Sequence, residues 1–65
     1  MAKFKAGDMI ITIEPTNVSV LMVNRVFMRH DTGKPVEYYS LDDGNGFSDA
    51  WDKCDYVDSL YRLCD

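Results

Sequence analysis

The stretch SDAWDKCDYVDSLYRLCD, residues 48–65, decides the fold because it can be read in two ways. As one helix with Ser48 as its N-cap, it gathers apolar side chains on a single stripe: Ala50, Trp51, Cys54, Val57, Tyr61 and Cys64. As a helical turn followed by a strand, it sends Tyr61 and Leu63 to one side of a sheet and Arg62 to the other. Which interpretation holds decides the architecture.

Aspartate favours the second interpretation. It recurs at every third position, at Asp49, Asp52, Asp55 and Asp58, and aspartate is a poor residue in helix interiors. A long helix would also leave the preceding strands as a sheet with exposed edges. We therefore expect short helical turns across residues 49–58 and a closing strand over residues 60–64 that pairs with the first strand. A single C-terminal helix packed on the sheet is the alternative.

The residues before this stretch carry strand signals. Residues 9–13 are rich in β-branched side chains and end before Pro15. Along residues 18–28 the apolar face slips by one position between Val23 and Val26, which indicates a β-bulge at Asn24-Arg25.

Two turns frame a third strand. HDTGKP, residues 30–35, is a turn in which Gly33 can take a positive φ. VEYYSLDD, residues 36–43, follows as a strand, with Tyr39 and Leu41 facing inward and Tyr38 facing outward. DDGNG, residues 42–46, has hairpin chemistry, and we expect a short strand through Phe47 after it.

This order of elements predicts a mainly β protein, a small barrel of about five antiparallel strands that forms one domain over residues 1–65. FKAGDMIITI, residues 4–13, resembles the opening of small SH3-like and KOW-like barrels. YYSLDDG, residues 38–44, and YVDSLYRL, residues 56–63, fit the continuation of that pattern. Small phage-encoded proteins are often similar, so the resemblance implies a phage accessory or host-takeover protein.

Charge is distributed unevenly along the 65 residues. The formal net charge is −4, made up of +2 over residues 1–30 and −6 over residues 31–65. A negative field repels phosphate backbones and attracts basic protein surfaces. No run of about 18 apolar residues predicts a membrane span, and the N-terminus has no apolar segment typical of a secretory signal. We expect a cytoplasmic protein, in the host cytoplasm if it is phage-encoded.

Catalytic and metal-binding patterns are weak. His30 is the single histidine and lies in a predicted turn, while Cys54 and Cys64 lack the Cys-x-x-Cys spacing of zinc sites. Both cysteines are expected to be free thiols. DDGNG lacks the twelfth-position glutamate of a calcium loop. The sequence therefore predicts a protein that is not an enzyme and has no cofactor or metal.

Binding is the better-supported function. Tyrosine and tryptophan are common anchors of protein interfaces, and here they alternate with aspartates that could form a charged rim. We predict a surface for a protein with a basic patch, made by Tyr38, Asp49, Trp51, Asp52, Asp55, Tyr56 and Asp58. Trp51 has a second interpretation, as a core residue that closes one end of the barrel.

Two other functions stay open. Lys3, Lys5, Arg25 and Arg29 could bind nucleic acid if they meet on one face, as in KOW-like or Tudor-like modules. An oligomer of this small barrel could instead hold a nucleotide-like ligand between its subunits. Self-association is plausible in either case, because a small domain gains buried area by pairing.

Overall fold

The computed structural model describes residues 2–44 and 49–64. In these residues the chain forms five strands and one helix: β1 (Met9–Thr12), β2 (Val20–Asp31), β3 (Lys34–Asp42), β4 (Ala50–Lys53), α1 (Cys54–Leu60) and β5 (Tyr61–Leu63). The strands pair antiparallel in one sheet with the order β4-β3-β2-β1-β5. The predicted mainly β fold of about five antiparallel strands is confirmed.

The C-terminal stretch folds as a helical turn and a closing strand. β5 pairs with β1 in the register Ile10↔Leu63 and Thr12↔Tyr61. The backbone N–H of Cys64 also donates to the carbonyl of Met9 over 2.9 Å. The predicted C-terminal strand that pairs with the first strand is therefore confirmed, although it does not close the sheet within the described residues, and the alternative of a single C-terminal helix is wrong.

The helix begins at Cys54 and not at the expected residue 49. Residues 50–53 form β4 instead, where Trp51 pairs with Ser40 and Asp52 pairs with Tyr39. Pairing with β3 satisfies backbone groups that a helix would otherwise have used. The strand that we expected through Phe47 lies outside the described residues.

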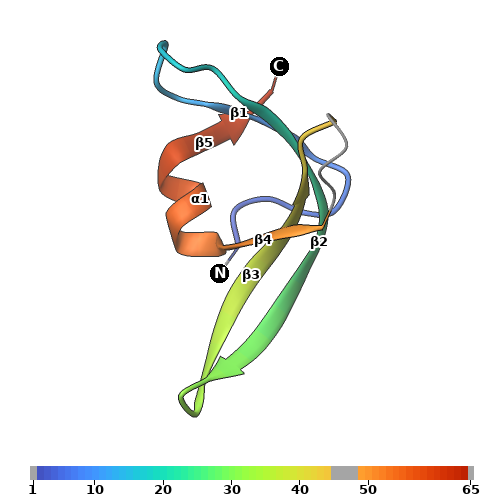
Figure 1. The fold of residues 1–65 in the computed structure, drawn as a ribbon, viewed down its shortest axis with the longest axis vertical. Helices are drawn as coiled ribbons and strands as arrows, with labels where there is room; N and C mark the ends of the chain where they lie inside the picture. Colours follow the sequence, from blue (N-terminus) through green and yellow to red (C-terminus); the bar gives the residue numbers. More distant parts are fainter. Residues whose placement is uncertain (1, 45–48, 65) are drawn as a thin grey trace.

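The sheet is curved but open. β4 and β5 stand at its two ends and do not pair with each other in the part of the chain that the structure describes. Figure 1 shows α1 leading from the end of β4 across to β5. The structure is thus a curled sheet and not the closed barrel that we expected. A helix connects the two edge strands, which would have to pair with each other to close a barrel. No helix of the described residues is long and apolar enough to cross a membrane.

The β-bulge predicted in β2 is confirmed. The register of β2 against β3 shifts between Val23 and Arg25. Val23 is fully buried before the shift, and Val26 packs against the core after it. Arg25, Phe27 and Arg29 consequently lie on the outer face of the sheet.

Beyond the bulge, β2 and β3 continue as a long hairpin arm that extends away from the body of the protein (Figure 1). Its two-residue turn holds Thr32 at φ 51° and Gly33 at φ 80°. Two positive φ angles in a two-residue loop are typical of a type I′ turn, whose twist matches that of the strands.

The core lies on the inner side of the sheet, under α1 and the N-terminal segment. Its buried members are Phe4, Ile10, Val23, Tyr39, Leu41, Cys54 and Val57. Tyr39 and Leu41 thus face inward, as the sequence predicts.

The hydroxyl of Tyr39 joins three parts of the chain. It accepts a hydrogen bond from the backbone N–H of Phe4 over 3.0 Å and donates to Asp58 Oδ1 over 2.5 Å. Asp58 Oδ2 in turn accepts from the backbone N–H of Lys3 over 3.2 Å. Burial, followed by the hydrogen bond to Asp58, raises the pKa of Tyr39 far above its usual range, so the phenol keeps its proton and remains a donor.

We predict that Tyr39→Phe lowers the free energy of unfolding by about 1–3 kcal/mol, because the variant removes the hydroxyl that the Phe4 N–H and Asp58 Oδ1 share as a partner. Urea denaturation followed by circular dichroism measures this change. Tyr56→Phe is the matched control, since Tyr56 is exposed on α1, and we expect it to change stability by less than about 0.5 kcal/mol. Equal effects of the two variants would contradict a role for the Tyr39 hydroxyl.

Both cysteines are free, but only Cys64 is exposed. Burial, with Glu37 as a smaller contributor, raises the pKa of the Cys54 thiol to about 11. In mildly alkaline buffer we therefore expect a colorimetric thiol reagent to label one cysteine rapidly and the second only after unfolding. Cys64→Ser should abolish the rapid phase; a rapid phase that persists in this variant would show that Cys54 is accessible.

Candidate functional site on the outer face of the sheet

Three strands each place one aromatic side chain on the outer face of the sheet. Phe27 of β2 and Tyr38 of β3 are opposite each other in register, with ring centroids 5.8 Å apart in a stacked arrangement. Trp51 of β4 meets the Phe27 ring edge to face, at a centroid distance of 5.1 Å. Phe27 and Tyr38 are half-buried, whereas Trp51 is 49% exposed. Aromatic pairs in these geometries stabilise one another beyond simple burial.

Two arginines of β2 stack on these rings. The guanidinium carbon of Arg25 lies 4.7 Å from the Phe27 centroid. That of Arg29 lies 5.6 Å from the Tyr38 centroid and 5.3 Å from the Trp51 centroid. These contacts arise because alternate residues of a strand line one face. Stacking attracts the cation to the ring and orients the planar guanidinium group.

We call this surface the aromatic face. It consists of Arg25, Phe27, Arg29, Tyr38, Trp51 and Lys53. Lys53, at the end of β4, belongs to it because it is opposite Tyr38 in register.

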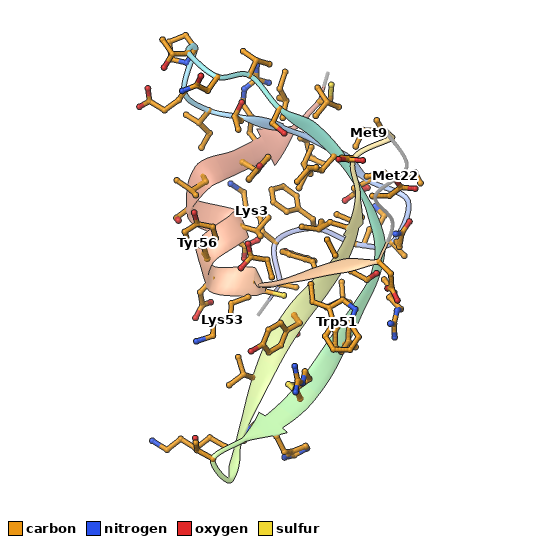
Figure 2. The ribbon with its side chains drawn as sticks, in the orientation of Figure 1. Lys3, Met9, Met22, Trp51, Lys53 and Tyr56 are labelled. Carbon is orange, nitrogen blue, oxygen red and sulfur yellow. The ribbon has the colours of Figure 1, made fainter. Side chains whose placement is uncertain are left out.

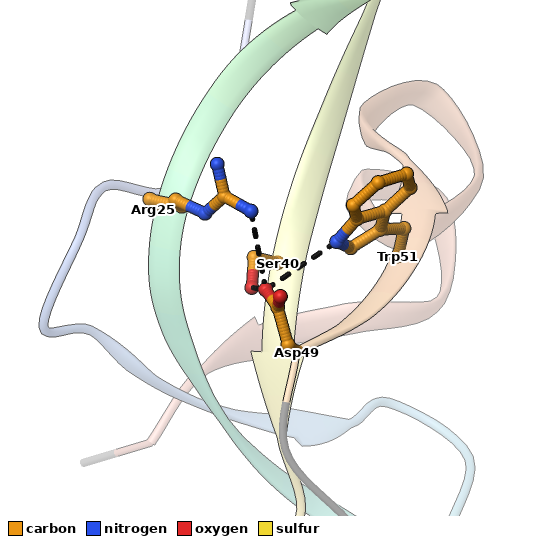
Figure 3. A network of polar contacts seen from close by, with 4 residues as sticks. All are labelled: Arg25, Ser40, Asp49 and Trp51. Atoms are coloured by element: carbon orange, nitrogen blue, oxygen red, sulfur yellow. Dashed lines mark hydrogen bonds and ion pairs between the residues drawn. The ribbon is translucent and has the colours of Figure 1, made fainter.

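Asp49 holds one edge of the aromatic face (Figure 3). Its Oδ1 accepts hydrogen bonds from Arg25 Nη2 and Trp51 Nε1, each over 3.3 Å, and also from the Ser40 hydroxyl. Ser40 is fully buried, so its hydroxyl requires a partner. The hydrogen bond from Ser40, followed by those from Arg25 and Trp51, lowers the pKa of Asp49.

The structure brings together three of the residues that the sequence predicts for the binding surface: Tyr38, Asp49 and Trp51. Trp51 is at the surface, so its interpretation as a core residue is wrong. Tyr56, on α1, lies well apart from Trp51 in Figure 2.

The four regularly spaced aspartates do not surround Trp51. Asp52 is opposite the buried Tyr39 in register and thus belongs to the other face of the sheet. Asp55 is exposed in the first turn of α1, and Asp58 is bonded to the Tyr39 hydroxyl. Only Asp49 belongs to the site.

The four basic residues of the nucleic-acid alternative are likewise divided. Arg25 and Arg29 belong to the aromatic face. The backbone N–H of Lys3 donates to Asp58 of α1, and its side-chain nitrogen lies 5.5 Å from the centroid of the Phe4 ring. Lys5 forms an ion pair with Asp8 over 4.0 Å.

Sequence reasoning missed Phe27 and Lys53, and it assigned the two arginines to a different surface. A signal for Phe27 was present. The two-residue turn at Thr32-Gly33 pairs Asp31 with Lys34, and counting back along both strands places Phe27 opposite Tyr38. Nothing local to Lys53 indicates that β4 would bring it beside Tyr38.

A groove of about 470 Å³ adjoins the aromatic face. Met28, Pro35, Val36, Glu37, Lys53 and Asp55 line it. β4 pairs with residues 38–41 of β3 only, so the groove runs along a part of β3 that has no strand on this side within the described residues. An extended chain segment fits such a position beside a strand edge.

Comparisons with protein families, with curated proteins and with solved structures found no match for this chain. Within the described residues, no group of three or more His, Cys, Asp or Glu side chains is placed to hold a metal ion.

The Asp49 contacts predict a pH dependence. Because the pKa of Asp49 is lowered in the folded protein, the network is intact above the usual aspartate range and is lost as the pH falls through the lowered value. Trp51 is the single tryptophan, so its fluorescence should change with a midpoint below the usual aspartate pKa, and Asp49→Asn should remove this transition. Asp55→Asn is the control that keeps it. Circular dichroism in parallel separates the transition from acid unfolding, and a midpoint at or above the usual value would contradict the network.

Proposed function

We propose that this protein is a non-catalytic binding protein that recognises a protein partner through the aromatic face. The observation that carries the proposal is the cluster of Phe27, Tyr38 and Trp51, kept on the outside of the sheet with two arginines stacked on the rings. Tryptophan, tyrosine and arginine are the side chains most enriched where protein interfaces derive their binding energy.

The aromatic face is held in place before any partner binds. Phe27 and Tyr38 are half-buried against each other, and the hydrogen bond to Asp49 orients the Trp51 indole. Side chains that are already ordered lose little conformational entropy on binding, which favours affinity. Trp51 is then the natural anchor, since about half of its surface is open to a partner.

A protein fits this face better than a nucleic acid does. Guanidinium groups already stack on the rings that bases would need. Asp49 places a carboxylate within the face, and the whole chain carries a net charge of −4. A long polyanion that extended beyond the few cations of the face would be repelled.

Three further parts of the proposal rest on the sequence and the strand order. The pairing of β5 with β1 and the order of the sheet support a relationship to SH3-like and KOW-like barrels. The resemblance of residues 4–13 to these proteins supports a phage-encoded accessory protein. Such a protein would act in the host cytoplasm, as an inhibitor or adaptor of a host or phage protein.

Affinity capture from nuclease-treated bacterial lysate, with wild-type protein and two variants as bait, tests the proposal. We expect a specific protein to be retained by the wild type and by Tyr56→Ala, and to be lost with Trp51→Ala. After purification of that protein, Trp51→Ala should weaken binding by at least tenfold, because truncating a central interface tryptophan costs about 2 kcal/mol or more.

Tyr56→Ala is a matched control, because Tyr56 is an exposed aromatic residue of the same C-terminal region outside the aromatic face. A partner that is retained equally by Trp51→Ala and lost with Tyr56→Ala would transfer the site to α1. A partner that disappears with nuclease treatment would replace protein binding by nucleic-acid binding.

A further inference from the structure

The aromatic face has a charge opposite to that of the whole protein. With Arg25, Arg29 and Lys53 positive and Asp49 negative, its formal charge is +2. The rest of the chain has a formal charge of −6, and the two sum to the net charge of −4. The acidic character of the chain therefore does not describe the surface where its exposed tryptophan lies. A partner selected by charge complementarity would bring negative groups to this face.

Asp49 shows what kind of group the face holds. A guanidinium N–H, an indole N–H and a hydroxyl from three different strands converge on a single carboxylate oxygen (Figure 3). Arginine is suited to carboxylates, since its planar donors match two carboxylate oxygens. Asp49 therefore occupies the position that a carboxylate of a ligand would take.

We infer that the partner segment is acidic and apolar, and that Asp49 competes with its carboxylate for the donors of Arg25 and Trp51. This inference rests on the proposed function. A glutamate or aspartate of the partner binds the donors of Arg25 and Trp51, and an apolar side chain beside it packs against the exposed Trp51 ring. The sequence suggested a partner with a basic surface. Such a partner would instead meet Arg25, Arg29 and Lys53 beside Trp51.

The backbone conformation of Asp49 guides the choice of a test variant. Its φ of 62° lies in the left-handed region, which aspartate and asparagine adopt more readily than most other residues with a side chain. Asparagine tolerates this φ and keeps an oxygen for the buried Ser40 hydroxyl, but it has no charge for Arg25. Asp49→Asn is therefore a substitution that changes the competition while leaving the fold in place.

The sign of the Asp49→Asn effect tests the inference. The probes are a short peptide of alternating glutamate and leucine, the same peptide with lysine in place of glutamate, and single-stranded oligothymidylate. The readout is the fluorescence of Trp51, the single tryptophan. We expect the glutamate peptide alone to bind, severalfold more tightly to Asp49→Asn than to the wild type, and less tightly as salt rises.

Arg25→Gln and Arg29→Gln should each weaken binding of the glutamate peptide by about tenfold, the loss expected for a charge-assisted hydrogen bond of roughly 1.5 kcal/mol. Lys34→Gln is the matched control. It removes the same charge from the start of β3, at the end of the hairpin arm, and should leave the affinity unchanged.

Several results would overturn the inference. Weaker binding by Asp49→Asn, or preference for the lysine peptide, would show that Asp49 contacts a basic partner. Preference for oligothymidylate would show that the face binds phosphates. No response to the glutamate peptide would remove the acidic class of partner. Preference for oligothymidylate would also count against a protein partner. The other results leave the proposed function untouched, because that function is tested separately by protein capture with the wild type and with Trp51→Ala.

Discussion

The β-bulge between Val23 and Arg25 is the constraint on which the rest of the structure depends. Before it, Val23 faces the core. After it, the same strand turns the next odd-numbered residues outward, so that Arg25, Phe27 and Arg29 reach the surface while Val26 packs against the core. A regular strand would have kept one parity throughout and would have directed the arginines toward the core side. One extra residue thus allows a single strand to serve the core at one end and the aromatic face along its arm.

β3 completes this division between two faces. Tyr39 and Leu41 point to the core and are buried, whereas Tyr38 and Ser40 belong to the outer face. Ser40 is nevertheless fully covered, which would be costly for an unpaired hydroxyl. Asp49 satisfies it and thereby also fixes Arg25 and Trp51. The site is consequently tied to the fold through a buried serine, and the polar network that stabilises the sheet is also the one that orients the exposed indole.

Much of the fold could be predicted because its signals are local. The slip between Val23 and Val26 indicates the bulge, Gly33 permits the hairpin turn, and the alternation around Tyr39 separates the two faces of β3. The position of the site could be predicted only in part. Aspartate at every third residue suggests a common rim, but Asp49 precedes β4 and Asp52 lies within it, whereas Asp55 and Asp58 lie on α1. Residues three apart point in different directions on a strand and on a helix, so this spacing does not keep the side chains on one face where a strand changes into a helix. The boundary between β4 and α1 depends on pairing with β3. The spacing of residues within 48–65 contains no information on that pairing.

The aspartates also show how the net charge of a small protein can differ from the charge of one of its surfaces. Asp58 accepts a hydrogen bond from a buried tyrosine, and Asp49 accepts one from a buried serine. Both carboxylates serve as acceptors for hydroxyl groups inside the fold, so they contribute to the charge total without forming a common acidic surface. The arginines, in contrast, are kept at the surface by rings from three strands. Charges interact more strongly at short range than across the whole molecule, so the electrostatic surroundings of Trp51 are set by the arginines of the aromatic face more than by the acidic composition of the chain.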